Sequence, residues 1–375
     1  MAEPPAGPPA AAPAERGDSE APLRAHRDAI DAIDREILAR LNERATHARA
    51  IGGLKADSGG PAWRPEREAE VLARLTAGNP GPLTDEQVVG VFRRVMSACL
   101  ALEQRLRIAY LGPAGTFSHA AVLRQFGEHV DALPCVTIDE IFRVGEGGRA
   151  DYAVVPVENS TEGAVGRTLD LMCTTELSIC GEIKLRVQQN LLSNAAALDG
   201  VFRVYSHPQS LAQCSQWLAR RLPAAQCVPV SSNAEAARVA AGEEGAAAIA
   251  GEVAASIYGL TVLASHIEDE PNNSTRFWVL GRQSVPASGH DKTSLVMSAP
   301  NRPGAVHALL APFATHGVSM TRFESRPART GLWEYLFFVD LAGHRDDPPV
   351  AAALRELATA APFLRLLGSY PAAPA

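Results

Sequence analysis

The period of the hydrophobic pattern changes twice along this chain, and those changes constrain its fold more than any other feature. In the first part, apolar residues recur every three or four positions, as in amphipathic helices. In the second part, short apolar runs alternate with helical stretches, which is typical of an α/β sheet. In the third, the order strand, helix, strand, strand, helix, strand indicates a ferredoxin-like arrangement. The sequence therefore predicts three domains of different classes, at residues 23–104, 105–285 and 291–371.

The composition argues against several classes of protein. A chain of 375 residues is too long for one ordinary core. Its net charge of −7 argues against a nucleic-acid binder. No apolar run approaches the roughly 18 residues that a membrane span needs. Residues 1–22 are rich in Pro and Ala and lack the order of a secretion signal, so they are expected to be a disordered tail.

Neither the cysteines nor the glycines form a cofactor motif. The six cysteines include no C-x-x-C pair, and five of them lie in apolar or helical surroundings. Free thiols in a reducing cytoplasm fit this pattern better than disulfides or a metal site. The stretch from Gly112 to Gly115 lacks the third glycine of a dinucleotide-binding loop, and no P-loop lysine is present. We therefore expect a cytoplasmic protein without a metal or a cofactor.

The first part predicts three helices. Apolar residues from Ile30 to Ile51 follow one long amphipathic helix, and the loop 57–61 ends it. A second helix is expected near Pro65, and the capping box Thr84-Asp-Glu-Gln87 predicts the start of a third. Because about 80 residues in three helices make a thin core, this domain is expected to need a partner chain.

The charged residues of the helical part allow two interpretations. Arg44 and Lys55 lie almost three turns apart on one face, about 16 Å along the axis, and their side chains could bracket a small dianion. From their spacing alone, exposed basic residues on a long helix are the favoured interpretation. Arg67, Glu68 and Glu103 are ambiguous when each is taken alone.

Taken in order, these residues resemble the all-helical chorismate mutase family over Leu23 to Gln104. The resemblance is carried by Arg27, Arg44, Lys55, the run Arg64-Pro-Glu-Arg-Glu68 and the stretch Ser97-Ala-Cys-Leu-Ala-Leu-Glu103. It implies that Arg27, Arg44 and Lys55 bind the two carboxylates and the ether oxygen of chorismate. It also implies that Arg67 and Glu68 line the same pocket, with Glu68 touching the substrate hydroxyl.

Two further expectations follow from this resemblance. Arg27 and Arg44 lie about 25 Å apart along one helix, so both reach one molecule only if Arg27 comes from a partner chain, as in the family's interlocked dimer. Glu103 stands where some relatives carry Gln, and it must be protonated to donate a hydrogen bond to the ether oxygen. The sequence thus predicts a homodimer or a higher homo-oligomer, and a mutase activity that falls as pH rises through neutrality.

Four polar clusters follow predicted strands in the second part. They are Gly112–Ser118, Pro156–Gly163, Ser206–Gln209 and Asn272–Phe277. Each alone is consistent with a cap or a turn, and the last lies at the entrance of a predicted buried strand, Phe277–Leu280. A nucleophile pair of Ser206 and His207 is disfavoured, because adjacent residues rarely aim at each other and no G-x-S-x-G elbow exists.

Together the motifs YLGPAGTFS, DYAVVPVENS, VYSHPQ and NNSTRF resemble the prephenate dehydratase family, over Arg107 to about Leu280. The resemblance implies two α/β lobes like those of periplasmic binding proteins, with the site between them. It implies conversion of prephenate to phenylpyruvate with loss of CO2 and water, without metal or cofactor.

The same resemblance implies roles for individual residues of this part. Thr275 would donate a hydrogen bond or proton to the departing hydroxyl, and Arg276 would bind a carboxylate. The other expected residues would position the ring, bind the anion or otherwise contact the substrate; they are Glu158, Asn159, Ser160, Thr116, Ser118, Ser206, His207 and Phe277.

The third part resembles the ACT regulatory domains of prephenate dehydratases. The matching motifs are Asn301-Arg-Pro-Gly-Ala-Val306 and Glu324-Ser-Arg-Pro327. The resemblance implies that amides at Gly304 and Ala305 bind the carboxylate of phenylalanine, with Glu324 near its ammonium group. Val306, Ser325 and Arg326 complete the expected effector site.

These resemblances predict a bifunctional enzyme that phenylalanine inhibits. Two alternatives remain at this stage. Two α/β lobes with an amino-acid-binding domain would also suit a non-catalytic sensor or solute-binding protein, which would bind without turnover. The second alternative is a dehydratase that prefers arogenate, although a fused mutase, which makes prephenate, argues against it.

Overall fold

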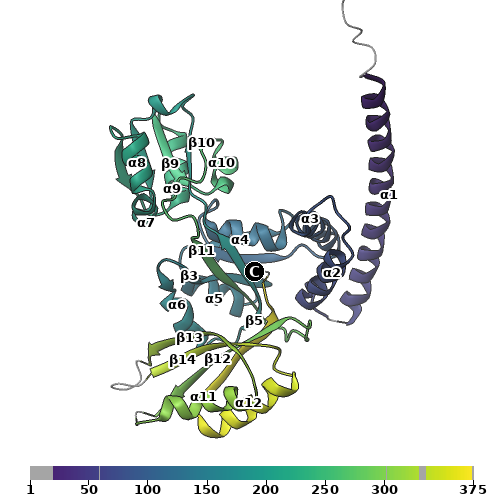
Figure 1. Ribbon diagram of the computed structural model, residues 1–375, viewed down its shortest axis with the longest axis vertical. Coiled ribbons are helices and arrows are strands. Elements are labelled where there is room, and N and C mark those ends of the chain that lie inside the picture. Colours follow the sequence, from purple (N-terminus) through teal and green to yellow (C-terminus); the bar gives the residue numbers. More distant parts are fainter. Residues whose placement is uncertain (1–19, 59, 301, 329–334, 374–375) are drawn as a thin grey trace, which may run out of the picture.

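The computed structural model describes residues 20–58, 60–300, 302–328 and 335–373. It contains a helical domain, two α/β lobes and a C-terminal α+β domain (Figure 1). The predicted fold classes are confirmed. None of the described helices is long and apolar enough to cross a membrane.

The helical domain consists of α1 (Glu20–Ser58), α2 (Pro65–Ala77) and α3 (Asp85–Glu103). The predicted capping box is present, since Thr84 Oγ1 accepts from Gln87 N and Gln87 Oε1 accepts from Thr84 N. Helix α1 begins at Glu20, so the expected tail is wrong at its end: residues 20–22 are helical. The remainder of that tail lies outside the described residues.

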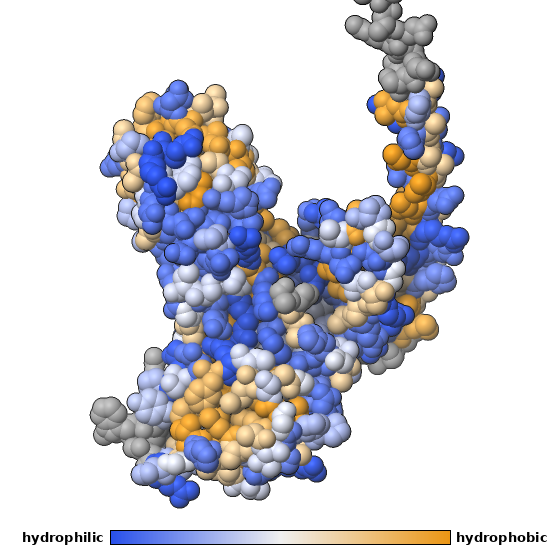
Figure 2. All heavy atoms as spheres, in the orientation of Figure 1, coloured by the Kyte–Doolittle hydropathy of each residue, from blue (hydrophilic) through white to orange (hydrophobic). Residues whose placement is uncertain are grey.

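Helix α1 packs on α3 near its C-terminal end and otherwise extends away from the body of the protein (Figure 1). Its apolar residues are therefore exposed, and they appear as orange patches along the helix in Figure 2. Ile30 is 55% exposed and Ile37 is 50% exposed. The amphipathic pattern thus predicted the helix, but none of the residues that the structure describes covers its apolar face.

The first lobe is a mixed sheet with the strand order β2-β1-β3-β11-β5. Its strands are β1 (Arg107–Leu111), β2 (Asp131–Cys135), β3 (Tyr152–Asn159), β5 (Ser178–Arg186) and β11 (Ser274–Gly281), and β4 (Gly163–Ala164) pairs with β3. Helix α4 (Phe117–Phe126) packs on one face. Helices α5 (Ile138–Glu146) and α6 (Gly166–Met172) pack on the other.

The second lobe is a sheet of the order β10-β6-β9-β7-β8. Its strands are β6 (Asn190–Ser193), β7 (Arg203–Ser206), β8 (Gln226–Pro229), β9 (Ala246–Ala250) and β10 (Thr261–Ala264). Its helices are α7 (Pro208–Gln213), α8 (Ser215–Arg221), α9 (Asn233–Ala241) and α10 (Glu252–Tyr258). The chain passes between the lobes twice, from β5 to β6 and from β10 to β11, which leaves the two sheets joined by two segments.

The C-terminal domain has the predicted βαββαβ order. Its elements are β12 (Asp291–Ala299), α11 (Ala305–Thr315), β13 (Met320–Pro327), β14 (Tyr335–Ala342), α12 (Pro348–Ala360) and β15 (Phe363–Pro371). The sheet order is β13-β14-β12-β15, with both helices on one face. The other face lies against the first lobe (Figure 1).

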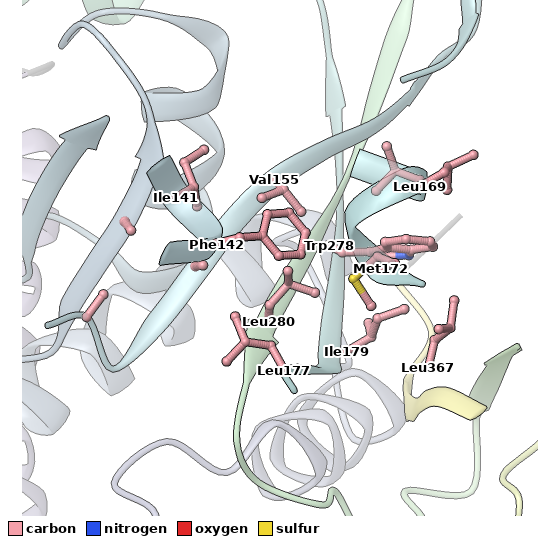
Figure 3. Close-up of a cluster of buried hydrophobic side chains, with 14 of the residues drawn as sticks. Ile141, Phe142, Val155, Leu169, Met172, Leu177, Ile179, Trp278, Leu280 and Leu367 are labelled. Carbon is pink, nitrogen blue, oxygen red and sulfur yellow. The ribbon is translucent and has the colours of Figure 1, made fainter. Parts of the chain in front are cut away.

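The first lobe and the C-terminal domain share one hydrophobic core. Val296, Phe338, Leu367 and Tyr370 of the C-terminal domain are buried together with residues of the first lobe, among them Trp278. In Figure 3, Leu367 lies beside Ile179, in the cluster that also contains Trp278. Leu367 lies at a register shift between β12 and β15, so a bulge directs it into the neighbouring lobe.

The helical domain is attached to the first lobe through Trp63, which precedes α2. Its ring is 4% exposed and makes edge-to-face contacts with Phe126 at 4.9 Å and Tyr152 at 5.1 Å. Gln283 Nε2 donates to the carbonyl of Trp63 at 3.1 Å. The loop after α1 therefore anchors this domain.

Candidate active sites

The ends of β3 and β11 bring Asn159 and Thr275 together. The two residues are register partners in the antiparallel pair. Asn159 Nδ2 donates to Thr275 Oγ1 at 3.0 Å and to Asn273 Oδ1 at 2.9 Å. Ser160 closes this end, because its Oγ accepts from Ser274 N at 3.0 Å. Three of the predicted residues therefore lie in one cluster.

The orientation of the Asn159 amide is determined by the loop that follows β3. Its Oδ1 accepts from Thr161 Oγ1 at 2.6 Å, from Thr161 N at 3.1 Å and from Glu162 N at 3.2 Å. The NH2 group must therefore face Thr275 and donate to it. Among the described residues the hydroxyl proton of Thr275 has no acceptor, so it is available to a ligand.

The second lobe contributes Gln213, at the end of α7, to the same cluster. Asn273 Nδ2 donates to Gln213 Oε1 at 3.2 Å, and Gln213 Nε2 lies 3.4 Å from Thr161 Oγ1. Gln189 Nε2 also approaches Gln213 Oε1, at 3.4 Å. The cluster around Thr275 thus spans the junction of the two lobes.

Ser206 and His207 face different partners and do not form a pair. Ser206 Oγ is fully buried and lies 2.8 Å from the carbonyl of Ile249 and 3.0 Å from Asn233 Oδ1. His207 caps α7, and its Nδ1 accepts from Gln209 N at 3.4 Å. In this structure Ser206 therefore links β7 to β9 and α9, and His207 supports the start of α7.

The glycine loop before α4 is stabilised by its own side chains. Thr116 Oγ1 donates to the carbonyl of Leu111 at 3.0 Å and accepts from His119 N at 3.3 Å. Gly115 N donates to His119 Nδ1 at 3.2 Å, which requires a neutral imidazole nitrogen. Burial lowers the pKa of His119 and thereby favours that neutral form. Ser118 is buried in the first turn of α4.

The structure moves the start of the strand that carries Thr275. The strand begins at Ser274 and not at Phe277, so Thr275 and Arg276 are consecutive strand residues that point to opposite faces of the sheet. Phe277 is 1% exposed and packs in the core on the α4 side. It lines that core and not a surface.

Arg276 and Glu158 lie on the face of the sheet that meets the C-terminal domain. Arg276 Nη1 is 2.6 Å from Asp340 Oδ2 on β14. Glu158 Oε2 is 3.1 Å from Arg322 Nε on β13 and 3.7 Å from Arg276 Nε. In this structure the two charged residues therefore contact the C-terminal domain and not Thr275.

In the helical domain, Lys55 and Glu103 lie together. Lys55 Nζ is 3.1 Å from Glu103 Oε2 and 3.1 Å from the carbonyl of Ala62. Gly52 allows this approach, because a Cβ there would lie 2.9 Å from Glu103 Cβ. Lys55, with its long side chain, and Gly52, which has none, thus determine where the Glu103 carboxylate lies.

The other predicted residues of the helical domain are spread out. Arg27 is exposed and Arg44 half-buried on α1, and Arg67 pairs at 2.9 Å with Glu70 on the surface of α2. Glu68 accepts from Trp63 Nε1 at 3.1 Å and from Gln125 Nε2 on α4 at 3.3 Å. Burial raises the pKa of Glu68. One chain therefore does not gather the full set.

A cavity of about 780 Å³ lies between α3 and α4, and residues 251–253 of the second lobe also line it. Four arginines contribute to its lining: Arg93, Arg94, Arg124 and Arg186. Arg93 also pairs with Glu68 at 3.5 Å, and Thr116 lies on the cavity wall. The cavity therefore borders Thr116 of the first lobe directly and Glu68 of the helical domain only through Arg93.

The predicted effector residues occupy two parts of the C-terminal domain. Gly304 has a φ of 79° and precedes α11, whose first residue is Ala305. Val306 is 36% exposed. This positive φ explains the glycine. At the start of α11 the amide of Ala305 already donates to the carbonyl of Arg302 at 3.2 Å. Asn301 lies outside the described residues.

The second group of effector candidates is on β13. Arg322 and Arg326 face the first lobe, and by alternation Glu324 shares their side while Ser325 points away. Arg326 Nη2 donates to Asp170 Oδ1 of α6 at 3.0 Å. Arg326 is therefore a contact between domains in this structure.

Comparison with known proteins agrees with these three parts. The chain matches the family Chorismate mutase type II over residues 26–104, Prephenate dehydratase over 108–285 and ACT domain over 293–359. A bifunctional chorismate mutase/prephenate dehydratase of Neisseria gonorrhoeae is 56% identical over 351 residues, which cover 93% of this chain and 96% of that protein. The chain belongs to this bifunctional family.

Two solved structures resemble the larger part of this family member. The prephenate dehydratase of Arthrobacter aurescens in complex with L-Phe has 36% identity and a TM-score of 0.65, and covers 71% of this chain and 90% of its own. GqqA, described as a novel type of quorum quenching acylase, has 32% identity and a TM-score of 0.66, and covers 72% of this chain and 98% of its own.

Sequence reasoning missed several residues of the chorismate mutase/prephenate dehydratase chain. Gln213 gave no signal, because a polar residue at a helix end is common. Asp340 and Glu182 did give one: each is a lone carboxylate within an apolar strand, and they are 2% and 6% exposed. A buried charge needs a partner, so each of these carboxylates should have led us to expect a positively charged residue beside it.

Proposed function

We propose that this chain converts chorismate to prephenate in its helical domain and prephenate to phenylpyruvate at the junction of the two α/β lobes. The observation that carries the second activity is the Thr275 hydroxyl, which accepts a hydrogen bond from Asn159 and has its proton available. Membership of the bifunctional family supports both activities.

In the dehydratase reaction, the bond between the ring and its carboxylate breaks and CO2 leaves. The released electron pair aromatises the ring and expels the hydroxyl on the opposite carbon. We assign to Thr275 a hydrogen bond to this departing oxygen, where negative charge develops. Because Glu158 lies on the other face of the sheet, the proton that completes water comes from elsewhere.

Arg276 had been expected to bind a carboxylate of prephenate. Its contact with Asp340 instead favours a structural role for Arg276, on the face of the sheet opposite Thr275. Asn159 and Ser160 then hold the end of the strand pair, and Thr116 stabilises the loop before α4.

The rearrangement of chorismate is unimolecular, so catalysis requires only that the compact conformer is held and that donors meet the breaking C–O bond. Lys55 and Glu103 provide a cation and a carboxyl group 3.1 Å apart. Arg27 lies about 25 Å along α1 from Arg44. We therefore propose a homodimer in which Arg27 of a second copy completes the site and α1 buries its exposed apolar face.

We propose that phenylalanine inhibits the enzyme through the ACT domain. The carboxylate of the ligand would meet the backbone amides at Gly304 and Ala305, beside Val306, and Glu324 would meet its ammonium group. Inhibition then requires a different affinity of phenylalanine for two states of the chain. We also propose a cytoplasmic location, supported by six unpaired thiols, of which Cys180 has its pKa raised by burial to about 12.

The proposed dehydratase role is tested with Thr275→Val and Thr275→Ser. The valine variant keeps the shape and loses the hydroxyl, so prephenate turnover should fall about a hundredfold. The serine variant keeps the hydroxyl and should retain most of the prephenate turnover. Chorismate turnover, measured on the same preparations, is the control for folding.

Near-normal prephenate turnover in Thr275→Val would remove Thr275 from the mechanism. Assays of the unaltered chain with chorismate, prephenate and arogenate separate the possible substrates. Binding of prephenate without turnover would instead support a sensor.

A further inference from the structure

Six buried or half-buried charges form a cluster between the first lobe and the ACT domain. Three come from the lobe and three from the ACT domain: Glu158, Glu182, Arg276, Lys292, Arg322 and Asp340. We call this set the interdomain charge cluster. Its three carboxylates balance its three cations, so it is neutral as a whole.

Asp340 is the most completely engaged member of the interdomain charge cluster. It is 2% exposed, and its Oδ2 lies 2.6 Å from Arg276 Nη1. Its Oδ1 accepts from Ser294 Oγ at 2.5 Å, and that hydroxyl is 2.7 Å from Tyr370 OH. With both oxygens held inside the ACT sheet, the carboxylate offers Arg276 a fixed point.

Arg276 has no other contact as close. Its Nη1 is 3.5 Å from Glu182 Oε2, and its Nε is 3.7 Å from Glu158 Oε2. Burial alone would lower the pKa of Arg276, but the charges of Asp340 and Glu182 more than offset that effect. Asp340 therefore determines where the guanidinium lies.

The position of Arg276 matters because of its neighbours in the sheet. Arg276 follows Thr275 on β11, and its register partner Glu158 precedes Asn159 on β3. The β3–β11 register shifts immediately after Arg276, between Arg276 and Phe277. The extra residue lies on β3, between Pro156 and Glu158, and such a bulge bends its strand and changes the direction of the side chains beside it.

We propose that Asp340 of the ACT domain is a positioning residue for the dehydratase: it holds Arg276 on the far face of the sheet and thereby places Thr275 and Asn159 at the lobe junction. The dehydratase centre is then incomplete without a carboxylate that the regulatory domain supplies. This inference rests on the proposed role of Thr275.

The experiment compares Asp340→Asn with Asp170→Asn in the full chain. Asp340→Asn keeps the shape of the side chain and removes its charge. Asp170 also joins the two domains, through Arg326 at 3.0 Å, but it lies on α6, which packs on β3, and not within the β3–β11 strand pair. It is therefore a control for loss of a charge at the same interface.

A displacement of the reacting groups by a fraction of an ångström costs between about tenfold and a hundredfold in rate. Asp340→Asn should thus lower the dehydratase kcat at least tenfold, with KM changed less than threefold and the mutase kcat unchanged. Asp170→Asn should leave the dehydratase kcat, the KM and the mutase kcat close to normal.

A double-mutant cycle with Arg276→Gln gives the second readout. If Asp340 acts through Arg276, the double variant should lose no more kcat than the more impaired single variant. Additive losses would overturn the proposal.

Other results also decide the question. A dehydratase kcat within twofold of normal in Asp340→Asn, or an equal loss in Asp170→Asn, would overturn the positioning role. Retained mutase activity and an unchanged circular dichroism spectrum show that a variant is folded. If Thr275→Val proves fully active while Asp340→Asn is impaired, the proposed role of Thr275 fails and not the effect of Asp340.

Discussion

Replacement of Gly368 by alanine should separate the ACT domain from the dehydratase lobe. A Cβ on Gly368 would lie 2.3 Å from the carbonyl oxygen of Ile179 and 2.9 Å from its nitrogen. Both are backbone atoms of β5, so no side chain can rotate away. Strands β15 and β5 must move apart to accept the methyl group.

The size of the effect follows from this geometry. Real Cβ atoms essentially never approach closer than 3.0 Å, so the strands must shift by about 0.7 Å, a gap that forfeits a quarter to a half of the local dispersion energy. Ile179 and Leu367, which are 1% and 2% exposed, lie at this seam. Overpacking of such a site costs about 2 kcal/mol, or roughly a thirtyfold change in the equilibrium between docked and opened seams.

Hydrogen–deuterium exchange over Ser178–Arg186 and Phe363–Pro371 measures this opening directly. Amides of both strands should exchange about thirtyfold faster in Gly368→Ala. The control is Gly289→Ala, where φ is also positive, at 90°, but no atom lies within 4 Å. Equal exchange in the two variants would show that backbone strain, and not contact with Ile179, is responsible, and would refute the reasoning.

Two further predictions concern single side chains. Because burial lowers the pKa of His119, the folded chain binds this proton less readily than the unfolded chain, so the free energy of unfolding should fall as pH drops below about 6.5. His119→Gln should lose less stability over that range, as thermal midpoints at pH 7 and pH 5.5 can show. Glu103→Ala removes the carboxyl group that lies 3.1 Å from Lys55 Nζ and should lower chorismate turnover, whereas Glu103→Gln keeps a hydrogen-bond donor there and should retain more of that turnover. Equal losses in the two variants would exclude Glu103 as the donor.

Capping residues and first-turn prolines predicted the helices because each acts on its own short segment of the chain. The capping box at Thr84 determines where α3 begins, and Pro65 suits a first turn. The start of β11 was misplaced because Ser274, Thr275 and Arg276 are polar, although they pair on both sides with β3 and β5. Backbone pairing with two neighbours outweighed the turn propensity of these residues.

The candidate sites were predictable only in part. Motif order predicted one cluster for Asn159, Ser160 and Thr275, and these residues lie together because Asn159 ends β3 and Thr275 lies at the start of the adjacent β11. It could not show that Arg276 points away from Thr275, because the face of a residue depends on where its strand begins. Nor could it pair Arg276 with Asp340, a contact between two domains that no local pattern encodes.

The bulge at Leu367 limits how this chain can be divided. Three family matches in a row suggest parts that can be cut and exchanged. A chain ending at Arg282 would leave Trp278 and Ile179 without the ACT side chains that cover them, so loss of phenylalanine sensitivity in such a fragment would not distinguish a missing effector site from a damaged enzyme. Transfer of a regulatory domain from a relative must therefore carry both sides of the seam, with β5 and β15 drawn from one parent.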